Sequence, residues 1–312
     1  MRTIKQEHYF PIIIGVHFIF WWIDLTFYTG DYEYTAQHIA GEVFSSWVVT
    51  VFVANFLMAT RAKWVEKIFG GLDKMYMIHR RSGVIAVALL LLHFIIVPKY
   101  PEFSIGKPMG FYSLVLILIG VILSAVPIFK RKIKYNKWVN FHKLMGLFYV
   151  LGIAHAFNVP TLTSELPIVR LYVFGMAFVG IIAWFYKAFL YNLFNKKLNY
   201  TVTNVKPFSN DIIEVSLKPE GKKLNFKAGQ FTFIKFDGIN SKEAHPFTIS
   251  NHPSDDELRF TIKSLGDYTA NIQSSLKEGL KAKVQGAFGQ FDYKNAKYKK
   301  QLWLAGGIGI TP

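Results

Sequence analysis

The sequence lacks cysteine, and it is poor in acidic residues. None of its 312 residues is cysteine, which excludes disulfides, an iron–sulfur cluster held by the chain's own thiolates and covalent haem attachment through a CxxCH motif. Aspartate and glutamate number 20 against 36 lysines and arginines, and the formal net charge is +16. Any cofactor of this chain is therefore held non-covalently, and the excess of basic residues requires an explanation.

Charged residues are scarce within several long stretches of the chain. Hydrophobic residues make up 52% of the sequence and aromatic residues 17%, a composition that excludes an ordinary soluble domain. Six apolar stretches of about 17 to 24 residues approach the length that spans a bilayer: 10–27, 43–59, 76–97, 111–129, 139–157 and 167–190. Because the basic residues fall between these stretches, we interpret them as topology signals and exclude nucleic acid as a partner.

The loops predict how the six stretches are oriented in the lipid bilayer. Lysine and arginine gather in 61–74 and 130–137, whereas the other loops are poorer in basic residues. The positive-inside rule places these two loops and both termini in the cytoplasm, in a multi-pass protein of the cell membrane. We interpret the acidic residues near the outer face, Asp31, Glu33 and Glu42, as part of a solvated loop, with attraction of cations as the alternative.

Two of the six stretches each carry a pair of histidines. His79 and His93 lie 14 residues apart, and on a helix this spacing turns both rings to one face, about 21 Å apart along the axis. Neutral imidazole is a common axial ligand of haem, and ionisable groups inside a membrane are costly and usually functional. The alternative is a set of polar histidines that hydrogen-bond between helices.

The second pair, His142 and His155, lies 13 residues apart. On an ideal helix these two rings differ in direction by about 140°. We therefore expect this helix to deviate from ideal geometry near Gly146 or Gly152, or else the haems to lie askew. The predicted topology makes the two helices parallel, so each ring of one pair shares its depth with a ring of the other. His17 lacks such a counterpart and is interpreted as structural, with lining of a haem cavity as the alternative.

The pattern His-x13-His followed by His-x12-His resembles the ferric reductase and NADPH oxidase superfamily of transmembrane b-type cytochromes. The resemblance implies two b-type haems, each held between the two helices. The implied metal ligands are His79 with His142 for the inner haem, and His93 with His155 for the outer haem.

Three further residues match positions that serve the haems in that superfamily. The resemblance puts Arg80 and Arg81 near the inner propionates, but a positive-inside anchor explains them equally well. Phe148 corresponds to the aromatic residue between the haems, which the resemblance counts as catalytic. From the sequence alone a core phenylalanine is the simpler interpretation.

From Tyr200 onward, short runs of β-branched residues alternate with Gly and Pro. This pattern predicts a small antiparallel barrel with strands at 200–205, 212–217, 231–236, 259–264 and 283–285. We therefore expect three parts: a six-helix transmembrane haem-binding bundle over 1–192, an FAD-binding barrel over 193–298, and the first strand of an α/β nucleotide-binding domain over 299–312.

The segment His245-Pro-Phe-Thr-Ile-Ser250 resembles the FAD-binding barrel of the ferredoxin–NADP reductase type, in the form used by the same superfamily. The resemblance implies that His245 and Pro246 bind the cofactor, with His245 beside its phosphates. Phe247 then lies against the flavin, and the Thr248 hydroxyl reaches the reactive isoalloxazine edge. Ser250 supports the end of the strand. The alternative for this segment alone, an ordinary strand end after proline, is less favoured.

A second segment, Lys263 to Thr269, resembles the turn and helix start that receive the FAD pyrophosphate in that superfamily. Backbone N–H groups at a helix start bind phosphate well. The resemblance implies cofactor contacts from Gly266, Tyr268 and Thr269, the last through its hydroxyl. Asp267 is interpreted as the helix cap.

The final run, 301–312, combines a short apolar strand with a glycine-rich turn. It resembles the segment that opens the NAD(P)H domain of the superfamily. Gly306, Gly307 and Gly309 are then part of an NAD(P)H site, and we expect a longer gene product that completes it.

Together these resemblances imply a transmembrane oxidoreductase that passes electrons from cytoplasmic NAD(P)H through FAD and two b-type haems to an acceptor outside the membrane, either ferric iron as a chelate or dioxygen. Val97 stands where superoxide-producing members carry another histidine, which weakens the case for a dedicated oxidase. Two alternatives remain: a haem and flavin conduit fed by a separate reductase partner, and a structural membrane protein with incidental histidines.

Overall fold

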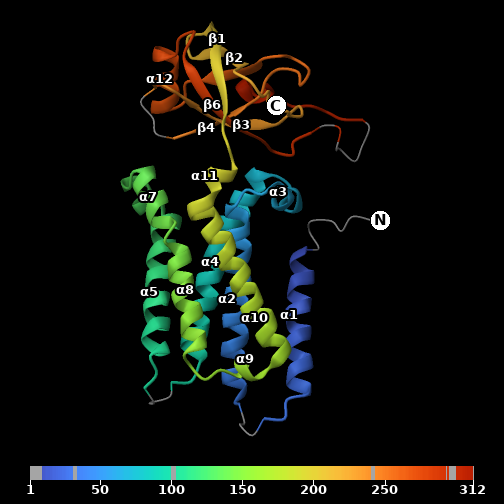
Figure 1. Ribbon diagram of the computed structural model, residues 1–312, viewed down its shortest axis with the longest axis vertical. Coiled ribbons are helices and arrows are strands. Elements are labelled where there is room, and N and C mark those ends of the chain that lie inside the picture. Colours follow the sequence, from blue (N-terminus) through green and yellow to red (C-terminus); the bar gives the residue numbers. More distant parts are fainter. Residues whose placement is uncertain are drawn as a thin grey trace. The chain divides into compact units, whose positions relative to one another are not determined.

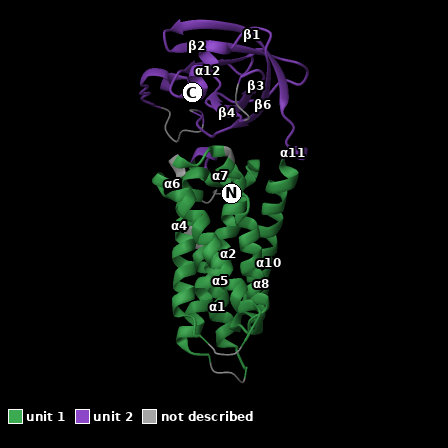
Figure 2. Cartoon of the chain, turned by 90° about the vertical axis from the view of Figure 1, so that its left-hand side faces the viewer, with its two compact units in different colours: residues 1–69, 74–191 green, residues 70–73, 192–312 purple. Residues whose placement is uncertain are grey.

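The structure is a computed structural model that describes residues 9–30, 34–99, 103–239, 243–292, 294 and 300–311. The chain divides into two compact units (Figure 2). Unit 1 comprises residues 1–69 and 74–191, and unit 2 comprises residues 70–73 and 192–312. Asp31 and Glu33, two of the acidic residues predicted to lie in a solvated loop, fall outside the described residues.

Unit 1 is a bundle whose long helices lie side by side (Figure 1). Its helices are α1 (Tyr9–Thr26), α2 (Ala36–Ala59), α3 (Lys63–Phe69), α4 (Leu72–Ile96), α5 (Gly106–Ala125), α6 (Pro127–Lys132), α7 (Tyr135–His142), α8 (Met145–Phe157), α9 (Leu162–Glu165) and α10 (Pro167–Phe185). The π-helical turn η2 (Tyr186–Leu190) and α11 (Tyr191–Phe194) continue α10 across the unit boundary.

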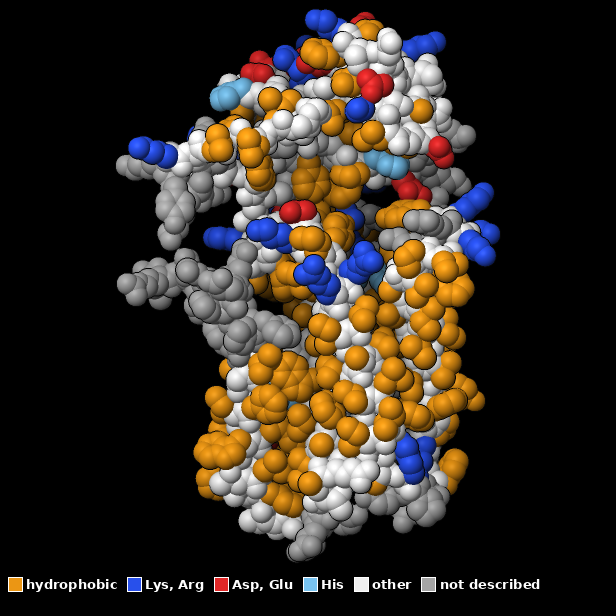
Figure 3. Space-filling model, turned by 180° about the vertical axis from the view of Figure 1, so that it is seen from behind, with side chains coloured by type: hydrophobic (Ala, Val, Ile, Leu, Met, Phe, Trp, Pro, Cys, Tyr) orange, Lys and Arg blue, Asp and Glu red, His pale blue; other side chains and the backbone are white. Residues whose placement is uncertain are grey.

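Four of the described helical segments are long and apolar enough to cross a membrane: α2, α4, α5 and the continuous segment 167–194. Hydrophobic side chains cover the face of the bundle that Figure 3 shows. Helix α1 is apolar over a shorter length, Ile13–Thr26. The fifth predicted stretch is divided between α7 and α8, and neither has the length of a span alone. The count of six crossings therefore remains a prediction.

The deviation expected in the helix of His142 and His155 lies at Lys143 and Leu144, where α7 ends and α8 begins. A break frees backbone groups that need other partners, and the Trp184 indole N–H donates to the Lys143 carbonyl at 2.7 Å. A Cβ at Gly146 would come within 2.1 Å of the Trp184 ring. The glycine thus lets Trp184 pack against the break.

His17 of α1 is buried against α2, as a structural histidine would be. Its Nε2 lies 3.1 Å from the Ser46 hydroxyl, which also accepts the indole N–H of Trp21 at 3.2 Å. The imidazole ring lies near the rings of Trp47 and Tyr172, with centroids 4.7 and 5.6 Å away. These contacts explain how a polar ring is accommodated between apolar helices.

Unit 2 contains a six-stranded antiparallel sheet with strand order β4-β3-β6-β1-β2-β5. Its strands are β1 (Leu198–Ser209), β2 (Ile212–Pro219), β3 (Phe231–Phe236), β4 (His245–Thr248), β5 (Leu258–Lys263) and β6 (Lys281–Phe288). The sheet curls so that its two ends meet, and Ser250 N after β4 donates to Arg259 O in β5 at 2.8 Å. Barrel closure beyond this contact stays a prediction.

The core of unit 2 follows from alternation along the strands. In β3, Thr232, Ile234 and Phe236 point inward and are buried, whereas the residues between them are partly exposed. Helix α12 (Asp267–Ser275) joins the same core through Ile272, which is fully buried. The packing of Ile272 fixes where the start of α12 lies relative to the sheet.

The strand predicted at the start of 301–312 does not form. Residues 301–305 have no regular structure, and Leu302 and Leu304 are 86% and 88% exposed. A strand needs a neighbour to take its backbone hydrogen bonds, and the described part of unit 2 pairs no strand with this run. The 3₁₀ turn η4 (Gly307–Ile310) follows.

Candidate functional site

The four histidines of unit 1 form two facing pairs. The ring centroids of His79 and His142 are 6.0 Å apart, with 70° between the ring planes. Those of His93 and His155 are 6.4 Å apart, with 71° between the planes. We call these the 79/142 pair and the 93/155 pair. The α7–α8 segment therefore runs in the same direction as α4, and the break between α7 and α8 lets His142 and His155 both face α4.

Both separations fit a metal ion held between two imidazoles. Metal–imidazole bonds are about 2.0 Å long, and each nitrogen lies about 1.1 Å from its ring centre, so two axial ligands place their centroids about 6.2 Å apart. The measured values of 6.0 and 6.4 Å lie on either side of this distance. The same spacing therefore recurs at both levels of the bundle.

Hydrogen bonds fix the tautomer of the 93/155 pair. His93 Nδ1 lies 2.8 Å from Gly41 O, and His155 Nδ1 lies 2.9 Å from Gly106 O. Because a carbonyl oxygen only accepts, both Nδ1 atoms carry the proton and donate. Each Nε2 is left with its lone pair, which is the form that binds a metal.

Glycines leave room around the facing rings. A Cβ at Gly110 of α5 would lie 2.7 to 2.9 Å from three atoms of the His155 ring, so only glycine accommodates that ring. Gly83 lies one turn after His79 on the same face of α4. A Cβ added there would meet no heavy atom within 4 Å. Space is thus open beside Gly83.

The positions of Phe148 and the two arginines leave both interpretations of each residue open. Phe148 of α8 is buried in the same core cluster as Ala86 of α4, and both lie between the levels of the two histidine pairs along their helices. The side chains of Arg80 and Arg81 are exposed beside His79. These placements suit the haem roles and the simpler roles of core residue and membrane anchor alike.

In unit 2 the fold brings the two predicted FAD segments together. The rings of His245 in β4 and Tyr268 in α12 stack with centroids 3.6 Å apart and 15° between planes. Burial lowers the pKa of His245 below its ordinary value and raises the pKa of Tyr268 to about 12. The pair is therefore neutral near pH 7, and each ring covers one face of the other.

The rest of the β4 segment is held in register by its neighbours. Phe247 pairs with Thr232 and Thr248 with Phe231 across β3. Phe247 packs partly against the core, and Pro246 is exposed. Both the amide and the hydroxyl of Ser250 donate to Arg259 O, at 2.8 and 3.0 Å, so Ser250 anchors the strand end to β5.

At the start of α12, the cap differs from the one predicted. Gly266 is the N-cap, and Asp267 is the first residue of the helix. The Thr269 hydroxyl accepts the N–H groups of Leu265 and Gly266 at 2.9 and 3.0 Å, and donates to Gly266 O. A side chain three residues into the helix thus closes the turn, which makes the carboxylate of Asp267 unnecessary as a cap.

Near the end of the chain, the glycines predicted to contact NAD(P)H lie at a 3₁₀ turn. Gly306 is the N-cap of η4, and Gly307 and Gly309 lie within it. Gly307 has φ of +55°, in the left-handed region that favours glycine.

Two family descriptions match separate parts of the chain. Residues 44–153 match the ferric reductase like transmembrane component, and residues 197–302 match an FAD-binding domain. The chain belongs to the ferric reductase and NADPH oxidase superfamily. The first match contains His79, His93 and His142 and ends two residues before His155. The second contains both segments that stack in unit 2.

Curated members of the superfamily resemble the chain at low identity. Dual oxidase 2 of Sus scrofa is 24% identical over 208 residues, which is 64% of this chain and 13% of that protein. A superoxide-generating NADPH oxidase heavy chain of Dictyostelium discoideum is 24% identical over 214 residues, 63% of this chain and 39% of that protein. The matched regions thus span well under half of these relatives.

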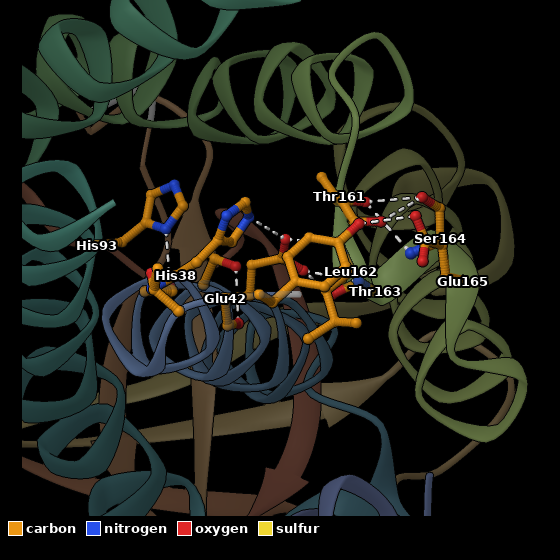
Figure 4. A network of polar contacts seen from close by, with 12 residues as sticks. His38, Glu42, His93, Thr161, Leu162, Thr163, Ser164 and Glu165 are labelled. Atoms are coloured by element: carbon orange, nitrogen blue, oxygen red, sulfur yellow. Dashed lines mark hydrogen bonds and ion pairs between the residues drawn. The ribbon is translucent and has the colours of Figure 1, made fainter. Parts of the chain in front are cut away.

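This superfamily member also holds a buried polar network that the sequence interpretation missed (Figure 4). Glu42 of α2 does not lie in a solvated loop, because it is only 3% exposed. Its carboxylate accepts Leu162 N at 2.7 Å, Thr163 N at 2.7 Å and the Thr163 hydroxyl at 2.6 Å, and lies 2.9 Å from His38 Nε2. Glu42 follows Gly41 directly, so it anchors the turn of α2 that accepts His93. The sequence feature that could have identified this network is an acidic residue directly before an apolar stretch.

Proposed function

We propose that this superfamily member is a transmembrane oxidoreductase that passes electrons from NAD(P)H through FAD and two b-type haems to an acceptor outside the membrane, ferric iron as a chelate or dioxygen. The observation that carries the proposal is the geometry of the two histidine pairs, at 6.0 and 6.4 Å. Two similar sites, one near each end of α4, suit electron passage from one side of a bilayer to the other.

Haem supplies one-electron redox chemistry when it is bound. The 79/142 pair holds the inner haem, and the 93/155 pair holds the outer haem, each through two Nε2 lone pairs. Gly41 and Gly106 keep His93 and His155 in the metal-binding tautomer. Phe148 fills the space between the two levels and keeps it dry. Arg80 and Arg81 complement the inner propionates and anchor α4 at the cytoplasmic surface.

FAD converts a two-electron donor into one-electron steps. The neutral stack of His245 and Tyr268 lies at the start of α12, whose first N–H groups suit a pyrophosphate. Phe247 contacts the flavin, and Thr248 hydrogen-bonds its reactive edge. The support for these roles is that two segments far apart in the sequence meet in one place.

The same proposal divides the chain into three parts and gives it one membrane topology. The bundle over 1–192 crosses the cell membrane six times, with α1 and the α7–α8 segment completing the crossings of the four long helices. The barrel over 193–298 binds FAD in the cytoplasm, where both termini also lie. The segment 299–312, with Gly306, Gly307 and Gly309, begins the NAD(P)H site.

Haem quantification tests the proposal. The purified protein, made in cells supplied with haem, is expected to contain two b-type haems per chain, seen as a reduced-minus-oxidised spectrum and counted as extracted haem. His93→Ala is expected to hold one. His252→Ala is the control, because His252 lies in unit 2 and the described hydrogen bonds of its imidazole go only to the neighbouring Ser254. A wild-type protein without haem would return the histidines to a structural role.

The acceptor is tested separately in membranes. Electron delivery to a ferric chelate is followed as chelated ferrous iron, and delivery to dioxygen as superoxide or peroxide, with NADH and NADPH compared as donors. Dependence of either product on His93 as well as on added NAD(P)H is the expected result. Product formation that survives His93→Ala unchanged would contradict passage through the outer site.

A further inference from the structure

One histidine of the 79/142 pair is held by side chains. Ser124, near the end of α5, has its hydroxyl oxygen 3.2 Å from His142 Nδ1. The same oxygen lies 3.1 Å from the indole nitrogen of Trp138 in α7 and 2.7 Å from Gly120 O. A single serine hydroxyl thus joins α5 to the helix that carries His142.

The direction of each hydrogen bond follows from what the groups can do. The Gly120 carbonyl only accepts, so the Ser124 hydroxyl donates its one proton there, at the shortest of its three distances. The Trp138 indole only donates, which takes one lone pair of the Ser124 oxygen. The second lone pair is left for His142, so His142 Nδ1 carries a proton and donates it.

This assignment leaves His142 Nε2 with a lone pair. The His142 ring faces His79, with centroids 6.0 Å apart. The Trp138 ring stacks on His142 with 5.2 Å between centroids and 22° between planes. The hydroxyl therefore sets the tautomer, and the indole restricts the rotation of the imidazole.

A second cluster contains the same three residue types, and comparison with it shows what is specific to the cluster around Ser124. In α1 and α2, Trp21 donates to Ser46, and Ser46 contacts His17. There the histidine uses Nε2 for the contact, and its ring lies between Trp47 and Tyr172. At Ser124 the contact uses Nδ1, which is the arrangement that leaves Nε2 to a metal.

We propose that Ser124 and Trp138 are positioning residues for the inner haem, acting through His142. This inference rests on the proposed function. A hydrogen-bond acceptor at Nδ1 raises the basicity of the ligating nitrogen, which stabilises the oxidised iron and lowers the reduction potential. Ser124 therefore keeps the reduction potential of the inner haem below the value expected for His142 without this hydrogen bond. It does not change the reduction potential of the outer haem.

The test titrates one haem at a time in the full chain. In a His93→Ala background only the inner haem remains, and Ser124→Ala is expected to shift its potential upward. Ser124→Thr keeps the hydroxyl and is expected to restore the original value. In a His79→Ala background only the outer haem remains, and Ser124→Ala is expected to leave its potential unchanged. Ser46→Ala, which removes the matched hydroxyl beside His17, is the control in both.

Electron paramagnetic resonance of the ferric protein gives a second readout, because the g values of a low-spin haem report the ligand planes. Ser124→Ala is expected to alter only the inner signal. An unchanged inner potential and signal in Ser124→Ala, or equal shifts of both haems, would overturn the inference while the haem content still supported the proposed function. Absence of haem from the wild type would overturn the proposed function itself.

Discussion

The 79/142 pair and the 93/155 pair have nearly the same ring geometry, yet their surroundings differ in kind. Both histidines of the 93/155 pair donate to backbone carbonyls, those of Gly41 and Gly106. In the 79/142 pair, His142 donates to the hydroxyl of Ser124. A carbonyl belongs to the backbone of its helix and stays when the residue is substituted, whereas a hydroxyl is removed by one substitution. The backbone thus holds both rings of one pair, whereas in the other pair a side chain holds the ring of His142.

Among the substitutions that test the contrast between the two pairs, Gly110→Ala is expected to have the largest effect, which is on haem content. In Gly110→Ala the new methyl group would overlap the His155 ring, with atoms at 2.7 to 2.9 Å, and Nδ1 would lose its bond to Gly106. We expect the haem content to fall from about two to about one per chain, because one axial ligand is displaced. Extracted haem per chain measures this.

Gly175→Ala is the matched control for Gly110→Ala. It makes the same exchange in α10, where the added Cβ meets no heavy atom within 4 Å. Haem content equal to that of the wild type is expected. If Gly110→Ala also retained both haems, the outer site would tolerate a displaced ring, and its proposed dependence on the backbone would be wrong.

A smaller effect is expected from Glu42→Gln. Glutamine keeps the shape of the side chain but lacks the buried negative charge to which Leu162 N and Thr163 N donate. Weakening of these bonds costs about 1 to 3 kcal/mol in the free energy of unfolding, so the thermal transition is expected to shift downward. Because Glu42 follows Gly41, the potential of the outer haem is expected to shift as well, and that of the inner haem is not.

Glu66→Gln provides the comparison for Glu42→Gln. Glu66 is another buried carboxylate of unit 1, paired with Lys63 at 3.3 Å, and it lies outside α2. Its neutralisation is expected to leave the potential of the outer haem unchanged. A potential that moved equally in both variants would reflect general loosening of the bundle and would remove Glu42 from the outer site.

The two histidine pairs also show which structural features the sequence could predict. The histidine spacing on α4 predicted one face, because 14 residues return a helix nearly to its starting direction. The break at Lys143 and Leu144 was predicted only approximately, near Gly146 or Gly152, because Trp184 from a distant helix stabilises it. Local spacing therefore located the candidate ligands, and tertiary packing decided how they face each other.

The groups behind the ligands could not be predicted at all. Ser124 is an ordinary residue of an apolar stretch, and Gly41 and Gly106 precede such stretches. Nothing in their sequence context links them to a histidine 18 to 52 positions away. In unit 2 the resemblance located both cofactor segments, but the stacking of His245 on Tyr268 depends on how α12 packs through Ile272. The wrongly predicted strand at 301–305 shows the same limit, since an apolar run cannot pair without a neighbour.

The smallest effect, and the one that sharpens the comparison most, is expected from Trp138→Phe. Phenylalanine keeps an aromatic ring against His142 but removes the N–H that draws electron density from the Ser124 oxygen. That oxygen becomes a better acceptor for His142, so the inner potential is expected to shift downward, opposite to Ser124→Ala and by less. Trp21→Phe removes the equivalent N–H from Ser46 and is expected to move neither haem. An upward shift in Trp138→Phe would mean that the indole acts through ring position alone, and the hydrogen-bond chain from Trp138 through Ser124 to His142 would then lose its role in setting the potential.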